Sequence, residues 1–334
     1  MNNRTALCLT VDTEFDIAGA FSNPDRNRPK GLESVWWTAG GEDQGLGFIL
    51  RTLKAYGVTA TFFVETLNRS YFGDGPMGSV VERLLEQGED IQLHLHPCWL
   101  AFDNKNWRRE VLAHPPGDTL SALPFDELVE VIGQGVERLQ QWGAKRPVAL
   151  RSGNLDSQAA IYRAMAKNGL KLASHIGTGY NPPGDVSLQL LGGRQWIEGV
   201  MEVPVTSYTH LPLSGQRRLR LWAITACSCQ EMESLLWSAR EQGVSTLVVI
   251  THPSEFIKRG AWGLQKNSVN QTRLAWLCRF VADHPEAFEM VNFGAAAEGW
   301  LQAGERPEPT LTAPLASVVA RMVENSLNDL LPWY

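Results

Sequence analysis

Residues 46–64 read Leu46-Gly-Phe-Ile-Leu-Arg-Thr-Leu-Lys-Ala-Tyr-Gly-Val-Thr-Ala-Thr-Phe-Phe-Val64, and this stretch decides the fold. Apolar side chains recur at helical spacing over residues 46–56, and an apolar run from Val58 to Val64 predicts a buried strand. Gly57 separates the two, because glycine readily adopts the left-handed backbone conformation that closes a helix. The stretch therefore predicts one helix–glycine–strand unit of an α/β protein.

The same unit recurs along the chain. With an opening strand at residues 6–11 and a strand at 200–203, we expect about seven strands. Strands that alternate with helices form a parallel sheet with right-handed crossovers. Polar residues end strands along the whole chain, and no glycine-rich phosphate fingerprint follows the first strand, so a barrel is favoured over an open sheet. The later units span residues 80–94, 128–150, 159–173 and 232–251.

Composition and charge narrow the class of protein. Of the 334 residues, 44% are hydrophobic and 20% are charged, as in ordinary globular proteins. A net charge of -6 gives no basic surface for nucleic acid. No apolar stretch approaches the roughly 20 residues that span a bilayer, and the first strand begins too early to leave room for a signal peptide. Together with five cysteines in no framework spacing, these features predict a cytoplasmic protein.

The C-terminal part differs in character from the rest. Residues 303–314 are rich in proline and predict a stiff linker after a catalytic barrel at residues 1–302. In residues 315–334, apolar side chains recur at helical spacing from Leu315 to Leu331, which predicts an amphipathic helix. Its apolar face must be buried, most commonly on its own barrel, next against a partner subunit in a homo-oligomer, and least expectedly on a membrane surface, because Arg321 is the one basic residue of the segment.

Two long connections follow predicted strands, at residues 17–45 and 97–124. Long loops in compact domains are usually functional lids or walls of binding sites. They carry Trp37 and Trp99, whose flat indole rings could stack on a sugar ring. The alternative is that these tryptophans form part of the core beneath the loops.

Four short polar signatures stand at the ends of apolar, strand-like runs. Buried strands have little use for carboxylates, imidazoles or guanidinium groups. The carboxyl ends of parallel strands, however, gather distant residues into one enzyme site. The recurrence therefore predicts an enzyme. The signatures are Thr10-Val-Asp-Thr-Glu-Phe-Asp16, Gln92-Leu-His-Leu-His-Pro97, Leu150-Arg-Ser-Gly-Asn154 and Val249-Ile-Thr-His-Pro253.

The first two signatures suggest a metal site. Asp12 and Glu14 are two residues apart, as are His94 and His96, so on a strand each pair shares one face. Two imidazoles opposite a carboxylate can chelate zinc or a similar divalent ion and leave a coordination position open for catalysis. Acidic residues at strand ends can also cap helices or brace loops.

The other two signatures supply single ionisable residues. Arg151 cannot be buried as a lone charge, and its natural partner is Asp12. His252 ends the last apolar strand and would act as proton donor to a leaving group. His175 ends another predicted strand and is expected to line the pocket.

In this order, the signatures resemble those of the polysaccharide deacetylase family, also called the NodB-homology or carbohydrate esterase family 4 group. The resemblance covers roughly residues 5 to 255. It implies a distorted (β/α)7 barrel. It also implies metal-dependent removal of an N-acetyl or other N-acyl group from an amino sugar, in surface polysaccharide or glycan metabolism.

Carried over by position, Asp12 resembles the catalytic base, Arg151 the residue that tethers it, and His252 the general acid. The family's second aspartate is a metal ligand, but Thr13 stands at that position, so Glu14 would reach the metal instead.

The histidine motif departs from the family as well, because its two histidines are usually four residues apart. Cys98 stands four residues after His94, so either His96 substitutes or Cys98 binds as a thiolate; we favour His96, which shares the face of His94. The expected metal ligands are thus Glu14, His94 and His96, with Zn²⁺ as the expected ion.

Two other functions stay open. Thr13 and Cys98 would also fit a barrel that binds glycans without catalysis, and the same fold could hydrolyse other amides or ureides.

Overall fold

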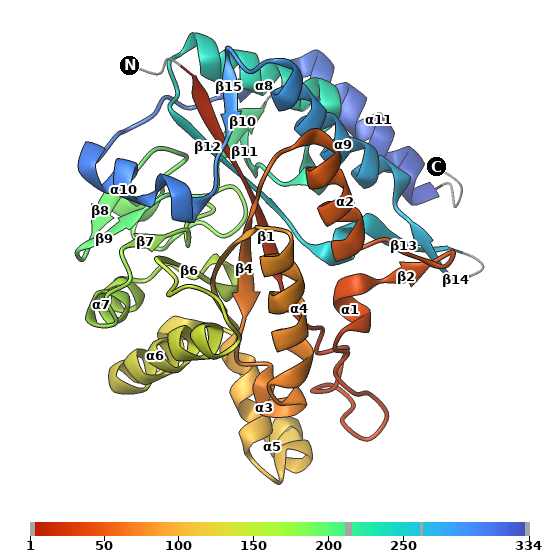
Figure 1. The fold of residues 1–334 in the computed structure, drawn as a ribbon, viewed down its shortest axis with the longest axis vertical. Helices are drawn as coiled ribbons and strands as arrows, with labels where there is room; N and C mark the ends of the chain where they lie inside the picture. Colours follow the sequence, from red (N-terminus) through yellow and green to blue (C-terminus); the bar gives the residue numbers. More distant parts are fainter. Residues whose placement is uncertain (1–3, 211–215, 261–262, 331–334) are drawn as a thin grey trace.

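The computed structural model describes residues 4–210, 216–260 and 263–330 (Figure 1). Its centre is a curled sheet in which seven strands run parallel, in the spatial order β12-β1-β4-β5-β6-β7-β9. These strands correspond to the seven expected from the sequence. Their bounds are β1 (Thr5–Thr13), β4 (Thr61–Glu65), β5 (Asp90–Leu95), β6 (Ala149–Ser152), β7 (Leu172–Ala173), β9 (Val200–Glu202) and β12 (Thr246–Thr251).

Helices surround the curled sheet on its outer side (Figure 1). Their apolar faces pack on the outward side chains of the strands, and Gly57, at φ 62°, ends α2 as the sequence predicts. The helices are α2 (Leu46–Tyr56), α4 (Gly75–Glu86), α6 (Phe125–Gln141), α7 (Ala159–Lys167), α8 (Cys229–Glu241), α9 (Ser268–Asp283) and α10 (Phe293–Ala303).

Two further strands extend the sheet: β15 (Phe288–Met290) pairs with β1 in parallel, and β8 (Gln195–Ile197) pairs with β9 in antiparallel orientation. Between β9 and β12, the described residues form single contacts in place of a strand ladder. Thr206 N donates to Val248 O at 3.0 Å, and Ile250 N donates to Trp222 O at 3.1 Å. The expected distorted (β/α)7 barrel is thus confirmed, with one side held by these contacts.

A small second sheet, which the sequence did not reveal, lies beside the side of the barrel where β9 and β12 form only single contacts. In it, β10 (Ser207–His210) pairs with β11 (Arg218–Leu221) in antiparallel orientation and with β16 (Thr312–Ala313) in parallel. The strand β16 belongs to the segment expected to be a linker, and Arg306 in the same segment bridges to Arg194. Residues 303–314 therefore lie against the barrel.

The C-terminal helix α11 (Leu315–Leu330) packs beside α8 (Figure 1). Val318 is buried there, and Arg321 Nε lies 3.3 Å from Glu231 Oε2. The expected extension helix is confirmed up to residue 330, and residues 331–334 of its expected range lie outside the described part. Side chains of Leu315, Val319, Met322 and Val323 stay exposed on its far face. Among the described helices, none is long and apolar enough to cross a membrane.

The two long loops contain short elements of their own. The first holds α1 (Glu33–Trp36) and a hairpin of β2 (Thr38–Ala39) and β3 (Glu42–Asp43); the second holds a 3-10 turn at residues 97–103 and α5 (Trp107–Ala113). The remaining short elements are α3 (Arg69–Phe72), β13 (Ile257–Gly260) and β14 (Gly263–Lys266).

Candidate metal centre and catalytic residues

The two-residue period of the strands determines which side chains enter the barrel. On β1, Leu7 and Leu9 belong to the core cluster under the outer helices, whereas Cys8 belongs to the inner cluster with Phe63 and Val248. The inner row of β1 thus continues from Cys8 through Thr10 to Asp12. His94 on β5, Arg151 on β6 and His252 after β12 end corresponding inner rows, so the four signatures meet at the carboxyl end of the barrel.

Arg151 and Asp12 form a buried ion pair. Arg151 Nη1 lies 2.6 Å from Asp12 Oδ1, and the two side chains are 0% and 4% exposed. The guanidinium also donates to Thr10 Oγ1 at 2.9 Å, Ser174 O at 3.1 Å and Ser174 Oγ at 2.9 Å. The other carboxylate oxygen of Asp12 remains directed at the pocket, because Arg151 takes only Oδ1. The predicted pairing of these residues is present.

His252 lies on the other side of Asp12, with its Nε2 atom 3.9 Å from Asp12 Oδ2. Its Nδ1 atom lies 2.9 Å from Glu255 Oε1, and Glu255 Oε2 accepts from Thr251 Oγ1 at 2.6 Å. Burial by itself would lower the pKa of His252, but the hydrogen bond and charge of Glu255, followed by the charges of Asp12 and Glu14, raise this pKa to about 9. His252 is therefore a protonated donor at neutral pH.

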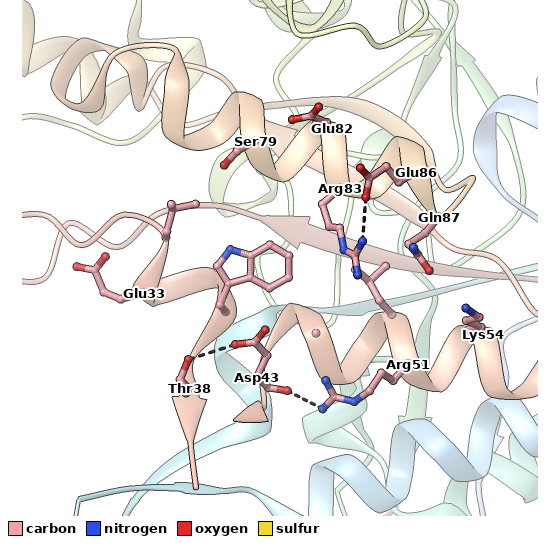
Figure 2. A pocket seen from close by; sticks show the side chains of 14 residues that line it. Glu33, Thr38, Asp43, Arg51, Lys54, Ser79, Glu82, Arg83, Glu86 and Gln87 are labelled. Atoms are coloured by element: carbon pink, nitrogen blue, oxygen red, sulfur yellow. Dashed lines mark hydrogen bonds and ion pairs between the residues drawn. The ribbon is translucent and has the colours of Figure 1, made fainter. Parts of the chain in front are cut away.

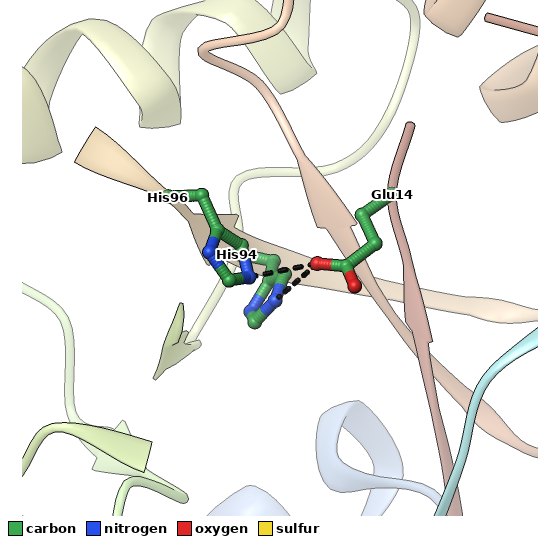
Figure 3. A group of neighbouring side chains, drawn as sticks. All are labelled: Glu14, His94 and His96. Carbon is green, nitrogen blue, oxygen red and sulfur yellow. Dashed lines mark ion pairs between the residues drawn. The ribbon is translucent and has the colours of Figure 1, made fainter. Parts of the chain in front are cut away.

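Glu14, His94 and His96 converge on one point (Figure 3). Glu14 Oε2 lies 2.7 Å from His96 Nε2 and 3.4 Å from His94 Nε2. One ligand atom from each of the three residues lies within 4.8 Å of the others. The structure thus brings together the three residues that the sequence predicts as metal ligands.

Hydrogen bonds on the far side of each imidazole fix its orientation. His94 Nδ1 lies 2.8 Å from Arg151 O, and His96 Nδ1 lies 2.6 Å from Asp118 Oδ2. A carbonyl oxygen only accepts, so His94 Nδ1 donates to Arg151 O, and Nε2 is the ring atom that faces Glu14. Metal-binding histidines in proteins are commonly held in this way by a carbonyl or carboxylate. The residues present therefore fit a divalent cation.

The charges at this point also favour a cation. Burial opposes ionisation of Glu14, yet the charge of His96 and hydrogen bonds from both histidines hold the pKa of Glu14 well below its usual value. Burial likewise opposes the charged form of His96, but Glu14 and Asp118 hold the pKa of His96 well above its usual value. The positive charge of the protonated His96 ring thus balances the carboxylates of Glu14 and Asp118, and a bound metal ion would supply this positive charge instead.

Gly153, in the third signature, makes room for the His96 ring. A Cβ atom at this position would lie 2.5 Å from His96 Nδ1 and 2.6 Å from His96 Cε1. Every residue except glycine would therefore displace the imidazole, which explains the glycine after Arg151 and Ser152.

Two pockets open on either side of the three converging residues, and both are lined by Glu14, His96 and His252. The first, about 400 Å³, also contains Asp12 and His94. The second, about 410 Å³, is lined in addition by residues of the two long loops, among them Trp37, Cys98, Trp99 and Asp118. The predicted base Asp12 and the predicted acid His252 thus border the first pocket, whereas Arg151 lies buried behind Asp12.

The residues predicted to contact the substrate differ in accessibility. Trp37 is half-buried and lines the second pocket. Trp99 is only 1% exposed and packs against Phe72 and Phe102. His175 is fully buried behind Arg151, where its Nδ1 atom accepts from Ser152 N at 3.0 Å. His175 therefore lines neither pocket, contrary to the expectation from the sequence, and Trp99 borders the second pocket with almost none of its indole exposed.

A larger hollow, of about 870 Å³, lies away from these groups between α1, α2 and α4. Figure 2 shows charged side chains of both signs around it, including the pair Arg83–Glu86 and Arg51, which donates to the backbone of Asp43. Its lining contains neither histidine nor cysteine. We therefore place the chemistry at the smaller pocket, where the perturbed and paired groups converge.

Two residues that the sequence did not single out belong to this site. Asp118 orients His96 and is itself held by Asn154 Nδ2 at 2.9 Å. Burial opposes its ionisation, but the hydrogen bond and charge of His96 lower the pKa of Asp118 to about 2. Glu255 orients His252. The sequence offered one signal for Glu255, which is its position three residues after His252 within a turn.

Comparisons with known proteins support the fold. No family model and no curated protein matches the sequence. Among solved structures, a protein from Mycobacterium smegmatis that was assigned to the polysaccharide deacetylases is similar with a TM-score of 0.58 and 16% identity, over 94% of this chain and 96% of that chain. A family 4 carbohydrate esterase from Streptomyces lividans, in complex with acetate, has a TM-score of 0.42 and 13% identity, over 91% and 98% of the two chains.

A 4-alpha-glucanotransferase from Thermococcus litoralis is also similar, with a TM-score of 0.51 and 8% identity, over 95% of this chain and 43% of that chain. The chain thus has the fold of polysaccharide deacetylases at low sequence identity, as the sequence signatures implied. Because proteins of different activity share this fold, the activity has to be argued from the site.

Proposed function

We propose that this protein is a metal-dependent hydrolase that removes an N-acetyl or other N-acyl group from an amino sugar, in the metabolism of a surface polysaccharide or glycan. One observation carries the proposal. An Arg-held carboxylate, a protonated histidine and a three-residue donor set for a cation border one pocket of about 400 Å³. These are the groups that metal-assisted amide hydrolysis requires.

Glu14, His94 and His96 would hold the ion. A carboxylate and two imidazoles are donors typical of catalytic zinc, with a coordination position left for substrate or water. When bound, the ion supplies Lewis acidity, which polarises the amide carbonyl group and acidifies water.

Asp12 would accept the proton of the attacking water. Arg151 holds Oδ1 at 2.6 Å and thereby orients the carboxylate, while Oδ2 faces His252 and the pocket. The other hydrogen bonds of Arg151, to Thr10 and Ser174, keep its guanidinium group in place when Asp12 takes up the proton. Asp12 is thus a base of fixed orientation.

His252 would donate a proton to the departing amine. Glu255 accepts from Nδ1 and, together with the charges of Asp12 and Glu14, raises the pKa of His252 to about 9, so the proton on Nε2 is present at neutral pH and faces Asp12. A base and an acid only 3.9 Å apart can act on the two sides of one scissile bond in succession.

The proposal is tested by release of acetate from N-acetylated monosaccharides, nucleotide sugars and oligosaccharides by the zinc-loaded protein. We expect Asp12→Asn to retain zinc at Glu14, His94 and His96 and to lose turnover, and His94→Ala to lose both the zinc of this donor set and turnover. Release of acetate by Asp12→Asn at the wild-type rate would refute the role of the base. The alternative of a non-catalytic glycan-binding barrel predicts that the wild type takes up no zinc while it still binds sugars.

A further inference from the structure

The His96 ring has two different environments at its two nitrogen atoms. Nε2 faces Glu14 at 2.7 Å, which is the donor set described above. Nδ1 faces Asp118 at 2.6 Å, and the thiol of Cys98 is directed at the same place. The ligand atoms of His96, Cys98 and Asp118 all lie within 4.8 Å of one another. A second donor set therefore lies directly behind the first.

This second set has the composition of a zinc site. Imidazole, thiolate and carboxylate are the three protein ligands that zinc uses, and a thiolate selects thiophilic ions over calcium or magnesium.

The backbone holds the three side chains in place. Cys98 N donates to Asp118 Oδ1 at 3.4 Å, and Asn154 Nδ2 donates to Asp118 Oδ2 at 2.9 Å. Gly153 leaves room for the His96 ring in this position, because a Cβ atom there would lie 2.5 Å from His96 Nδ1. The set is thus assembled before any ion arrives.

The second set can be reached without passing Asp12 or His94. His96, Cys98 and Asp118 all line the pocket of about 410 Å³ between the long loops, whereas Asp12 and His94 line only the other pocket. A hydrated cation can therefore reach Cys98 without passing the proposed base.

We propose that His96, Cys98 and Asp118 form a second site for a thiophilic divalent cation, which shares His96 with the first site. Occupation of this site forms bonds from the cation to Cys98 Sγ, His96 Nδ1 and Asp118, and releases the thiol proton and the proton on His96 Nδ1 to solvent. The hydrogen bond that orients His96 is then lost.

The experiment uses Co²⁺ as a spectroscopic probe and measures bound metal per chain in the full-length protein. We expect the wild type to bind two equivalents and to show the near-ultraviolet charge-transfer band of a cobalt–thiolate bond. Cys98→Ser should bind one equivalent without this band. His94→Ala should bind one equivalent and keep the band, and circular dichroism checks that each variant is folded.

The metal content and spectra of these variants test the second site independently of the proposed function. A wild type that binds a single equivalent with no thiolate band would overturn the second site and leave the first intact. A single equivalent whose band persists in His94→Ala would refute the first site, and with it the two-ion arrangement. Cys98→Ala, which has no oxygen to replace the thiolate, should give the same result as Cys98→Ser.

Discussion

Replacement of Arg151 by methionine tests the buried ion pair that orients the proposed base. Arg151 is fully buried and donates to Asp12, Thr10 and Ser174, and its guanidinium lies 4.2 Å from the ring centre of Phe63. Methionine has a similar shape but no charge, so it leaves the Asp12 carboxylate buried without a counter-charge at Oδ1. Removal of one partner of a buried pair costs about 3–5 kcal/mol. We expect the free energy of unfolding to fall by that amount.

The assay is urea unfolding followed by circular dichroism, with a chelator present so that bound metal does not contribute. Arg163→Met is the matched control, because its pair with Glu198, at 3.2 Å, is half exposed on both sides. Exposed pairs contribute about 0–1 kcal/mol. The double variant Arg151→Met, Asp12→Asn should recover part of the loss, since it also removes the uncompensated charge. Equal losses in Arg151→Met and Arg163→Met would refute the reasoning.

Three further predictions concern the histidines. Gly153→Ala places a Cβ atom 2.5 Å from His96 Nδ1 and should weaken zinc binding, measured by competition with a chromogenic chelator, by at least about tenfold. Asp118→Asn removes the carboxylate that orients His96 and should weaken zinc binding by about 10–100-fold in the same assay. Glu255→Gln removes the main group that raises the pKa of His252, so the loss of turnover at alkaline pH, near pH 9 in the wild type, should move to lower pH.

Each of these predictions has a control or a contrary outcome. Gly299→Ala, at a position in α10 with open space around the new Cβ, should leave zinc affinity unchanged. Zinc affinities of Gly153→Ala and Asp118→Asn equal to that of the wild type would show that His96 is not a ligand. If Glu255→Gln and the wild type lose turnover at the same alkaline pH, His252 is not the acid, because the acid must be protonated to act.

Much of the fold follows from local patterns. The helix at residues 46–56 and its closing glycine are as predicted, because amphipathic spacing and glycine are local signals. The same is true of the inward direction of Asp12 and His94, which follows from the two-residue period of a strand. In contrast, β10, β11 and β15 are short and were not recognised, and β10 and β15 pair with strands far away in the sequence, β16 and β1.

The parts of the site that were missed lie outside periodic structure. Asp118 comes 22 residues after His96 in a loop, and Asn154 of another element holds it in place. A loop has no period from which the direction of a side chain could be predicted. Trp99 follows the strand β5 closely, but its neighbours Phe72 and Phe102 bury it, which depends on the folding of both loops together.

The central claim, that one cation joins the first strand to the histidine strand, is tested most directly by crystals of the zinc-loaded protein measured at the zinc absorption edge. The account predicts an anomalous peak about 2.0–2.2 Å from the Nε2 atoms of His94 and His96 and from a carboxylate oxygen of Glu14. The absence of a peak at this position, or a peak of full occupancy there in a Glu14→Ala, His94→Ala variant, would contradict it.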